Sequence, residues 1–86
     1  MRVLAYQGFR DFYRKLPASI QKKVEKQLYL LADNPRHPSL QVKKIRGTVG
    51  IREARVDRQY RLSFEMMGDT IYLRVVGNHD EVLKHP

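Results

Sequence analysis

The sequence predicts an α+β fold: an N-terminal strand, then a two-helix hairpin packed on one face of an antiparallel β-sheet. Two patterns lead to this expectation. Apolar residues recur at helical spacing between Phe9 and Leu31, and from residue 41 onward alternating segments are separated by glycines. With 86 residues the chain can enclose only one hydrophobic core, so residues 1–86 are expected to form a single domain.

Two amphipathic helices are expected in the first half of the chain. Apolar residues at offsets of zero, three, four and seven lie on one face of a helix, and the first set is Phe9, Phe12, Tyr13 and Leu16. The second set is Ile20, Val24, Leu28 and Leu31. Pro17 separates the two helices, and Asn34-Pro35 ends the second because proline disfavours helical geometry in the preceding residue. A short connection makes the pair antiparallel.

Strands are expected at both ends of this hairpin. Their predicted ranges are Met1–Tyr6, Gln41–Arg46, Ile51–Val56, Tyr60–Met67 and Thr70–Val76. In Tyr60–Met67 the apolar residues alternate with Arg61, Ser63 and Glu65, so one face is apolar and the other polar. The helices should cover the apolar face and leave the charged one open. The tail Glu81–Pro86 is too short to predict an independent element.

The charge of the chain indicates a polyanionic partner. There are 17 Lys and Arg residues against 9 Asp and Glu residues, a formal net charge of +8. Clustered cations bind phosphate backbones by releasing counterions, so nucleic acid is the first candidate. A membrane surface and an acidic protein are the alternatives. The absence of cysteines and of a signal-like apolar run leads us to expect a cytoplasmic protein.

The motifs of the common nucleotide- and metal-dependent enzymes are missing. The sequence has no phosphate-binding loop, dinucleotide fingerprint, zinc-protease helix or calcium loop. Its acidic residues are too few and too scattered for the paired carboxylates of a two-metal nuclease. If the chain cleaves RNA, we expect it to do so with no metal and no cofactor, using histidine for proton transfer and arginine for phosphorane charge.

His79 is the best candidate for proton transfer. It follows Gly77-Asn78 at the end of the last predicted strand, and the neighbouring Asp80 could orient its imidazole. The alternative is that these residues form an ordinary polar turn. His37 and His85 lie in a loop and near the end of the chain, where solvated residues are more common than catalytic ones.

Cationic and aromatic residues of the expected open face are candidates for RNA contacts. Arg55 and Arg61 lie on neighbouring strands, where each could bind a phosphate or could equally pair with Glu53, Asp57 or Glu65. Tyr72 could stack on a base, whereas the other tyrosines fit core or helix-face positions. The first hairpin carries a cluster that either follows RNA phosphates or keeps a sheet edge soluble: Lys43, Lys44, Arg46 and Arg52.

Several segments together resemble the toxins of the RelE/ParE superfamily. The matching runs are Asn34-Pro35-Arg36-His37-Pro38-Ser39-Leu40, Val42-Lys43-Lys44-Ile45-Arg46-Gly47, Ile51-Arg52-Glu53-Ala54-Arg55-Val56, Tyr60-Arg61-Leu62-Ser63-Phe64 and Val76-Gly77-Asn78-His79-Asp80. The resemblance covers nearly the whole chain, because the helical hairpin before them also fits the family's order of elements. No single motif is unique to the family, but their order is fairly specific.

The resemblance implies a role for several of these residues. In the ribonuclease members, an arginine of the Tyr-Arg-Leu strand stabilises the scissile phosphate, and Arg61 matches it. Several branches use a histidine after the last strand as the acid or base, and His79 matches that position. Arg55 is similar to a basic or imidazole position in relatives, and Glu53 is similar to an acidic one.

Two departures from the family pattern bear on activity. Many ribosome-dependent members carry Tyr or Phe a few residues after the histidine, where this chain has Leu83. Other members use a pair of strand lysines in place of histidine, where this chain has Arg52 and Ala54. The resemblance therefore implies the histidine type of mechanism, if the chain is active.

The implied function is that of the toxin in a type II toxin–antitoxin system. Such a toxin would be an endoribonuclease that cuts messenger RNA on the ribosome and inhibits translation, and a cognate antitoxin would neutralise it. Two alternatives remain at this point. One is an inhibitor of DNA gyrase like the ParE members, without chemistry of its own, and the other is a homologue that binds RNA without cleaving it.

Overall fold

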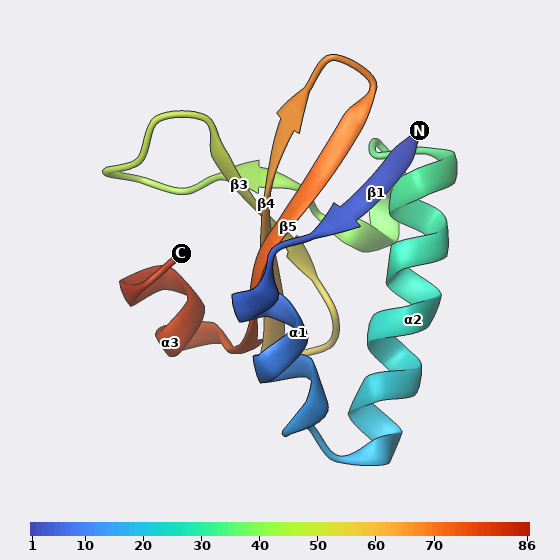
Figure 1. Ribbon diagram of the computed structural model, residues 1–86, viewed down its shortest axis with the longest axis vertical. Coiled ribbons are helices and arrows are strands. Elements are labelled where there is room, and N and C mark those ends of the chain that lie inside the picture. Colours follow the sequence, from blue (N-terminus) through green and yellow to red (C-terminus); the bar gives the residue numbers. More distant parts are fainter.

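Both expected helices and all five expected strands are present in the computed structural model, which describes residues 1–86 (Figure 1). The order is β1 (Arg2–Ala5), α1 (Gln7–Arg14), α2 (Ala18–Asp33), the 3-10 turn η1 (Pro38–Leu40), β2 (Lys43–Lys44), β3 (Ile51–Arg55), β4 (Tyr60–Met67), β5 (Thr70–Asn78) and α3 (His79–Lys84). The α+β class is confirmed. None of the protein's helices has the length and the apolar character needed to span a lipid bilayer.

The strands form one sheet in the order β1-β5-β4-β3-β2. The last four in sequence make the expected antiparallel meander, and β4 and β5 are joined through Gly68-Asp69, where Gly68 takes a left-handed φ of 61° that glycine tolerates. The sheet as a whole is mixed, because β1 pairs in parallel with β5. Parallel neighbours need a long connection, and the helices with the meander supply it.

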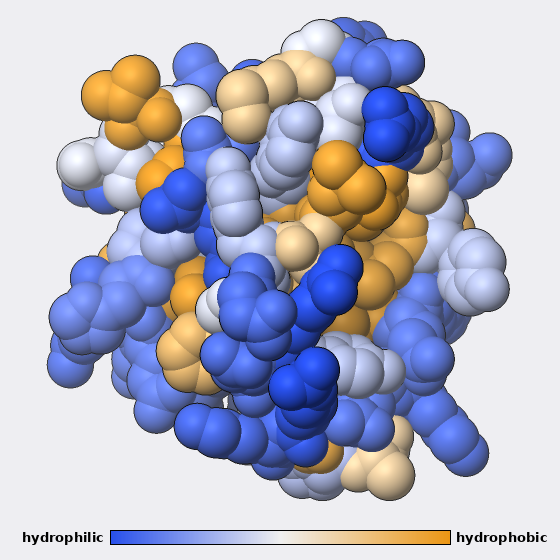
Figure 2. All heavy atoms as spheres, in the orientation of Figure 1, coloured by the Kyte–Doolittle hydropathy of each residue, from blue (hydrophilic) through white to orange (hydrophobic).

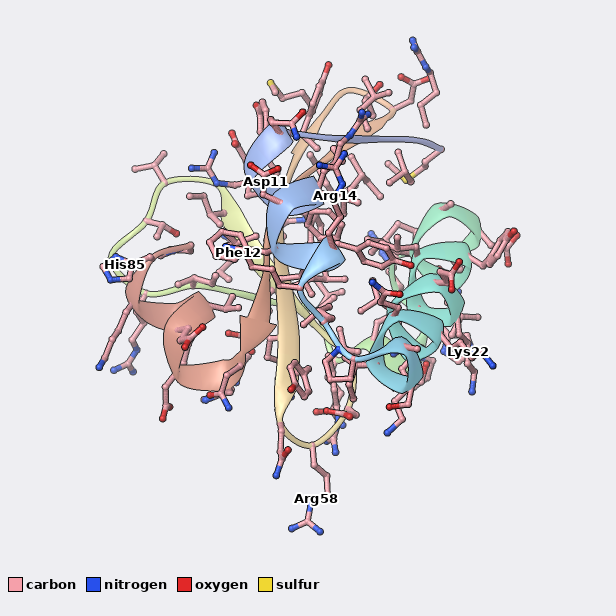
Figure 3. All side chains as sticks on the ribbon, turned by 60° about the horizontal axis from the view of Figure 1, so that its bottom comes forward. Asp11, Phe12, Arg14, Lys22, Arg58 and His85 are labelled. Atoms are coloured by element: carbon pink, nitrogen blue, oxygen red, sulfur yellow. The ribbon has the colours of Figure 1, made fainter.

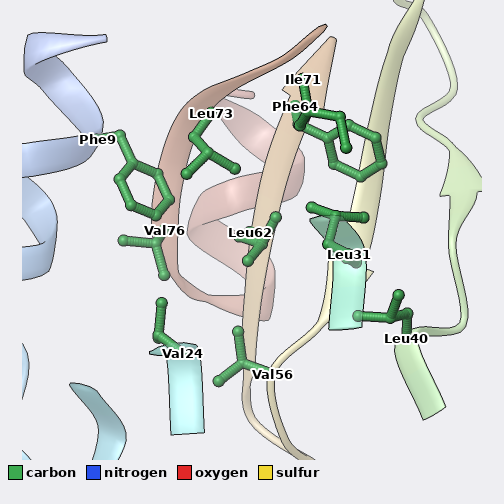
Figure 4. Packing of buried hydrophobic residues seen from close by; sticks show 11 residues of the cluster. Phe9, Val24, Leu31, Leu40, Val56, Leu62, Phe64, Ile71, Leu73 and Val76 are labelled. Atoms are coloured by element: carbon green, nitrogen blue, oxygen red, sulfur yellow. The ribbon is translucent and has the colours of Figure 1, made fainter. Parts of the chain in front are cut away.

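One face of the sheet and the helical hairpin enclose the core (Figure 4). Phe9 comes from α1, Val24 and Leu31 from α2, and Val56 directly follows β3. The sheet contributes most of the rest: Ala54, Leu62, Phe64, Ile71, Leu73 and Val76. The helical periodicity therefore identified the buried face. Phe12 is the exception, since it is 43% exposed although its spacing placed it on that face.

A buried amide ties α2 to the sheet. Gln27 is 7% exposed, and its side-chain nitrogen donates to the carbonyl oxygens of Arg55 at 2.7 Å and Ser39 at 3.3 Å. A buried polar group without partners would cost free energy, so these bonds favour one position of α2 along β3. Asn34 ends α2 before Pro35, as predicted.

The expectation that the tail has no secondary structure is wrong. Helix α3 begins at His79, and the Asn78 side chain caps it by accepting from the N–H of Asp80 at 3.1 Å. Asp80 and Glu81 lie in its first turn, where carboxylates favour the positive end of the helix dipole. Val82 is 2% exposed, so the helix is held by docking on the sheet, which its short sequence could not indicate.

Helix α3 lies on the sheet face opposite α1 and α2. A Cβ atom at Gly77 would lie 3.6 Å from Glu81 Oε2 and 4.0 Å from Val82 Cγ2, and Gly77 faces the same side as Arg61. The carbonyl oxygen of Pro86 accepts from Ser63 Oγ at 3.0 Å and from Arg74 Nε at 2.9 Å. We call this side, which the α1–α2 hairpin leaves uncovered, the open face; α3 and Pro86 cover part of it.

Replacing Leu62 by Ala tests the central packing. Leu62 is fully buried between Ala54 of β3 and Val76 of β5, so we expect the free energy of unfolding to fall by about 2–5 kcal/mol. Urea denaturation measures this value. Val49→Ala is the control, because Val49 is 97% exposed and its loss should change the free energy by less than about 0.5 kcal/mol. Equal effects of the two changes would contradict the assigned core.

Candidate functional site

Arg61 and His79 line the same shallow pocket at one end of the open face. The pocket has a volume of about 440 Å³ and no hydrophobic lining residue, and it is formed by Arg58, Gln59, Arg61, Asn78, His79 and Asp80. Strand pairing creates it: Tyr60 is opposite Asn78 and Arg61 is opposite Gly77. We call it the His79 pocket.

Two backbone features fix His79 at the edge of this pocket. Its N–H donates to the carbonyl oxygen of Gln59 at 2.7 Å, which joins the start of α3 to the β3–β4 turn. His79 is also the first residue of α3, and its ring Nδ1 lies 3.4 Å from Asp80 Oδ1. The side chain is 38% exposed. The imidazole is thus accessible, and a carboxylate lies beside one of its nitrogens, as the sequence suggested.

Arg61 is held from three sides within the protein. Its Nη1 donates to the carbonyl oxygens of Asp57 and, at 3.0 Å, of Tyr60, and its Nε lies 3.8 Å from Glu53 Oε1. Only 14% of the side chain is exposed. Arg61 therefore pairs with Glu53, one of the carboxylates that the sequence offered as its partner, and it also lines the His79 pocket.

Glu53 is buried beneath the open face. Its side chain is 2% exposed, and Oε1 lies 3.8 Å from both Arg61 Nε and Lys43 Nζ. Oε2 has no hydrogen-bond partner in the chain. A buried carboxylate is stable only beside compensating charge, so Glu53 holds the two cations in place more readily than it reaches a ligand.

Arg55 differs from Arg61 although the two are paired directly across β3 and β4. Their register places both on the open face, yet the Arg55 guanidinium has no hydrogen bond or ion pair within the chain, so the pairing alternative does not apply to it. Arg55 does not line the His79 pocket; it lines a separate pocket together with Lys23 and Asp57, and its free guanidinium is available for an anionic group.

The first-hairpin cluster is divided between the two faces of the sheet. Lys43 pairs with Glu53 and shares the open face, whereas Lys44 pairs with Arg52, whose neighbour Phe64 is in the core. Arg52 and Lys44 therefore lie on the helix side, away from His79. Arg46 is exposed in the β2–β3 loop. The residues expected to cluster around the first hairpin are therefore split between the two faces, because successive strand residues point to opposite sides of a sheet.

Tyr72 lies on the open face, as its alternation predicted. It is paired with Glu65 of β4, and its ring stacks on that of Tyr6 at a centroid distance of 5.9 Å. The Arg74 guanidinium lies 5.8 Å from the Tyr6 ring centroid. Tyr6 is 43% exposed and Tyr29 79%, so the expectation of core or helix-face packing is wrong for Tyr6, and Tyr29 is on an exposed face.

Sequence reasoning missed two arginines. Arg74 is on the open face because a bulge between β4 and β5 leaves both Arg74 and Val75 between the core residues Leu73 and Val76; it pairs there with Glu65. The sequence signal that could have found Arg74 is the break in the alternation of apolar and polar residues after Leu73. Arg58 lines the His79 pocket and projects from the tip of the β3–β4 turn, as Figure 3 shows. No pattern in the sequence indicated a role for Arg58, because it lies in a turn.

Asp57 organises that turn. Its Oδ1 accepts from the N–H groups of Gln59 at 2.9 Å and Tyr60 at 2.8 Å, and its Oδ2 lies 3.2 Å from Lys23 Nζ. Burial acts to raise the pKa of Asp57, but the two backbone bonds and Lys23 outweigh it, so the pKa lies below the ordinary 3.8. Through this turn α2 supports both Gln59, which holds His79, and the carbonyl group that holds Arg61.

An apolar groove lies elsewhere, along the free edge of β1. It has a volume of about 670 Å³ between β1, α1 and α2, and its lining includes Leu4, Phe9, Tyr13, Leu28 and Tyr29. Figure 2 shows an apolar patch in this region, next to a largely hydrophilic surface. The groove and the His79 pocket share no residue.

Known structures share this architecture. No protein-family model matches the chain, and no curated protein matches it. A chain of the RelB-RelE antitoxin-toxin complex from Methanococcus jannaschii matches with a TM-score of 0.76 and 24% identity, over 96% of this chain and 99% of that one. A chain of the intact RelBE toxin-antitoxin complex of E. coli matches with a TM-score of 0.72 and 19% identity, over 90% of this chain and 94% of that one.

The YoeB/ParE toxin from Agrobacterium tumefaciens gives a TM-score of 0.76 at 14% identity, over 92% of this chain and 99% of that one. In each of these three matches at least 90% of both chains is covered. The chain therefore has the fold of the RelE/ParE toxins, which confirms the fold that the resemblance implied.

The charge of Asp57 predicts how stability changes with pH. Because its pKa is lowered in the folded state, its contribution is complete above the unfolded value of about 3.8 and is lost as the pH falls through the folded pKa. Asp57→Asn keeps an acceptor for the turn but removes the charge. We expect the difference in free energy of unfolding between wild type and this variant to shrink from pH 7 to pH 3, measured by urea denaturation. A constant difference would contradict the assigned role.

Proposed function

We propose that the chain is the toxin of a type II toxin–antitoxin system and acts as a metal-independent endoribonuclease on messenger RNA. One observation carries this proposal: strand pairing places His79 and Arg61 in one open, polar pocket. The fold shared with RelE-type toxins supports the same reading. The site would act on RNA bound to the ribosome, where it would stop translation.

The reaction is a transfer within the RNA. The ribose 2′-oxygen attacks the adjacent phosphorus, the bond from phosphorus to the 5′-oxygen breaks, and a 2′,3′-cyclic phosphate forms. One proton leaves the 2′-hydroxyl and one reaches the departing 5′-oxygen. His79 is the proton-transfer group, since its exposed imidazole is oriented by Asp80.

Fixed cations stabilise the charge that develops on the phosphorane. Arg61 is held by Asp57, Tyr60 and Glu53, so it needs little rearrangement as that charge forms. Arg55 is free to bind a phosphate oxygen directly. Glu53 acts as a positioning residue for Arg61 and Lys43. The outer contacts to the RNA backbone and bases come from Lys43, Arg46 and Tyr72.

A protein partner belongs to the same proposal. Two of the similar structures are complexes of an antitoxin with a toxin. An acidic antitoxin would complement the net charge of +8, and the groove along β1 offers the apolar surface that such a partner needs.

Two observations favour a second function, RNA binding without cleavage. Arg61 already has three partners in the chain, and Leu83, at 38% exposure, supplies no aromatic ring on α3. A non-catalytic protein would keep the basic open face and lose the chemistry. Inhibition of gyrase, as in the ParE alternative, would need neither His79 nor RNA.

Replacing His79 by Ala should lower the rate of RNA cleavage by about 100-fold or more, as expected for loss of a general acid or base. Cleavage is followed by mapping RNA 5′ ends on translated messages, with and without ribosomes. His85→Ala is the matched control and should retain the wild-type rate. Full cleavage by folded His79→Ala protein would remove His79 from the site. No cleavage by the wild type, together with inhibition of supercoiling by gyrase, would select the ParE-like alternative.

Replacing Arg61 by Ala should also lower the cleavage rate by about 100-fold or more, because a fixed charge in the transition state is lost. Binding of an all-deoxy oligonucleotide, which lacks the attacking 2′-hydroxyl, should change much less. Thermal unfolding of the variant shows whether the turn survives. Arg10→Gln, an exposed change on α1, controls for lost charge. An equal loss of binding and cleavage would show that Arg61 serves binding alone.

A further inference from the structure

A second polar pocket lies between the end of α2 and β3, on the helix side of the sheet. Its volume is about 560 Å³, and its polar lining residues are Asn34, Arg36, His37, Gln41 and Arg52. No Asp or Glu residue lines it, and it shares no residue with the His79 pocket. We call it the Arg52 pocket.

Both arginines of this pocket lack a carboxylate partner. The side chain of Arg36 has no hydrogen bond or ion pair in the chain, since only its backbone N–H is engaged, by Asn34 Oδ1 at 3.0 Å. Arg52 is half-buried, and its Nη1 has a single contact, the Met66 sulfur at 3.4 Å. Sulfur is a weak acceptor, so the partly desolvated guanidinium keeps most of its capacity to donate.

His37 adds a donor of fixed tautomer. The N–H of Ser39 donates to His37 Nδ1 at 3.2 Å. An N–H can only donate, so Nδ1 accepts and the neutral ring carries its proton on Nε2. That N–H has no partner within the chain. Lys44 extends the positive charge beside the pocket, because its pairing with Arg52 places both on the same face.

We propose that the Arg52 pocket binds a phosphate group of a nucleic-acid backbone, separately from the His79 pocket. Planar guanidinium groups match the oxygens of a phosphate, and the imidazole and amide donors add further bonds. Only two of the nine lining residues are hydrophobic, whereas the buried centre of a protein–protein interface is apolar. Phosphate therefore fits this pocket better than an acidic protein segment does.

The position of the pocket gives it a distinct role. Arg52 faces the helix side near the Met66 end of β4, while Arg61 faces the open side near the other end of that strand. One strand of RNA lying in the His79 pocket would leave the Arg52 pocket for a phosphate of a different segment. The chain would then hold nucleic acid at two places, and the second would not depend on cleavage.

The test measures binding of inorganic phosphate and of an all-deoxy octanucleotide to the full chain by NMR. The octanucleotide lacks the 2′-hydroxyl, so the result is independent of the proposed reaction. We expect shifts of the His37 ring, the Arg52 side chain and the backbone amides of residues 36, 37 and 39–42. Arg36→Gln and Arg52→Gln should each weaken octanucleotide binding about tenfold, as for loss of a charged hydrogen bond. The control Arg10→Gln should weaken it less than about twofold.

Three outcomes would overturn the proposal. In the first, both variants bind as the Arg10→Gln control does. In the second, the shifts are confined to the His79 pocket, so that one site accounts for all binding. In the third, an octamer of glutamate shifts the same residues at lower concentration than the octanucleotide, and the partner is an acidic protein. Arg36 is exposed, so the Arg36→Gln variant should fold. It keeps the test valid if Arg52→Gln fails to fold.

Discussion

The antiparallel pairing of β4 with β5 is the constraint on which the rest of the structure depends. Leu62 and Phe64 of β4 and Leu73 and Val76 of β5 are all buried, and a slip by one residue would turn them to the other face. The same register sets Arg61 opposite Gly77 and so determines where α3 begins. Packing of the core thus fixes the position of His79 through the register of the two strands.

The open face is built from charges that hold one another. Glu53 is buried between Arg61 and Lys43, and Arg74 pairs with Glu65 while donating to Pro86. Arg55 stands apart because it has no partner. Fixed cations on such a surface can stabilise negative charge that develops in a transition state, and the free cation Arg55 can bind an anionic ligand. Helix α3 and Pro86 limit access to the centre of the face and leave its end open at His79.

Alternation along the strands predicted the open face, and spacing predicted the helices, because both depend on local geometry. The bounds of β4 were predicted fully, and those of β3 and β5 to within two residues. Helix α3 was not predicted, since it is held by the burial of Val82 against the sheet, which its own short sequence does not indicate. Arg74 was missed because a bulge depends on the partner strand. The cluster around Lys44 and Arg52 was misjudged because its residues were grouped by their place in the first hairpin, although neighbouring strand residues point to opposite faces.

The sequence by itself determined the fold class, the single core and the basic character of the chain, because hydrophobic periodicity and net charge are properties of the chain alone. It also singled out His79 and Arg61 as candidates. Only the tertiary structure decided that these two share a pocket, that Glu53 is buried and that Arg52 faces the other side of the sheet. These facts depend on strand register and helix docking, which bring together residues that are far apart in the sequence.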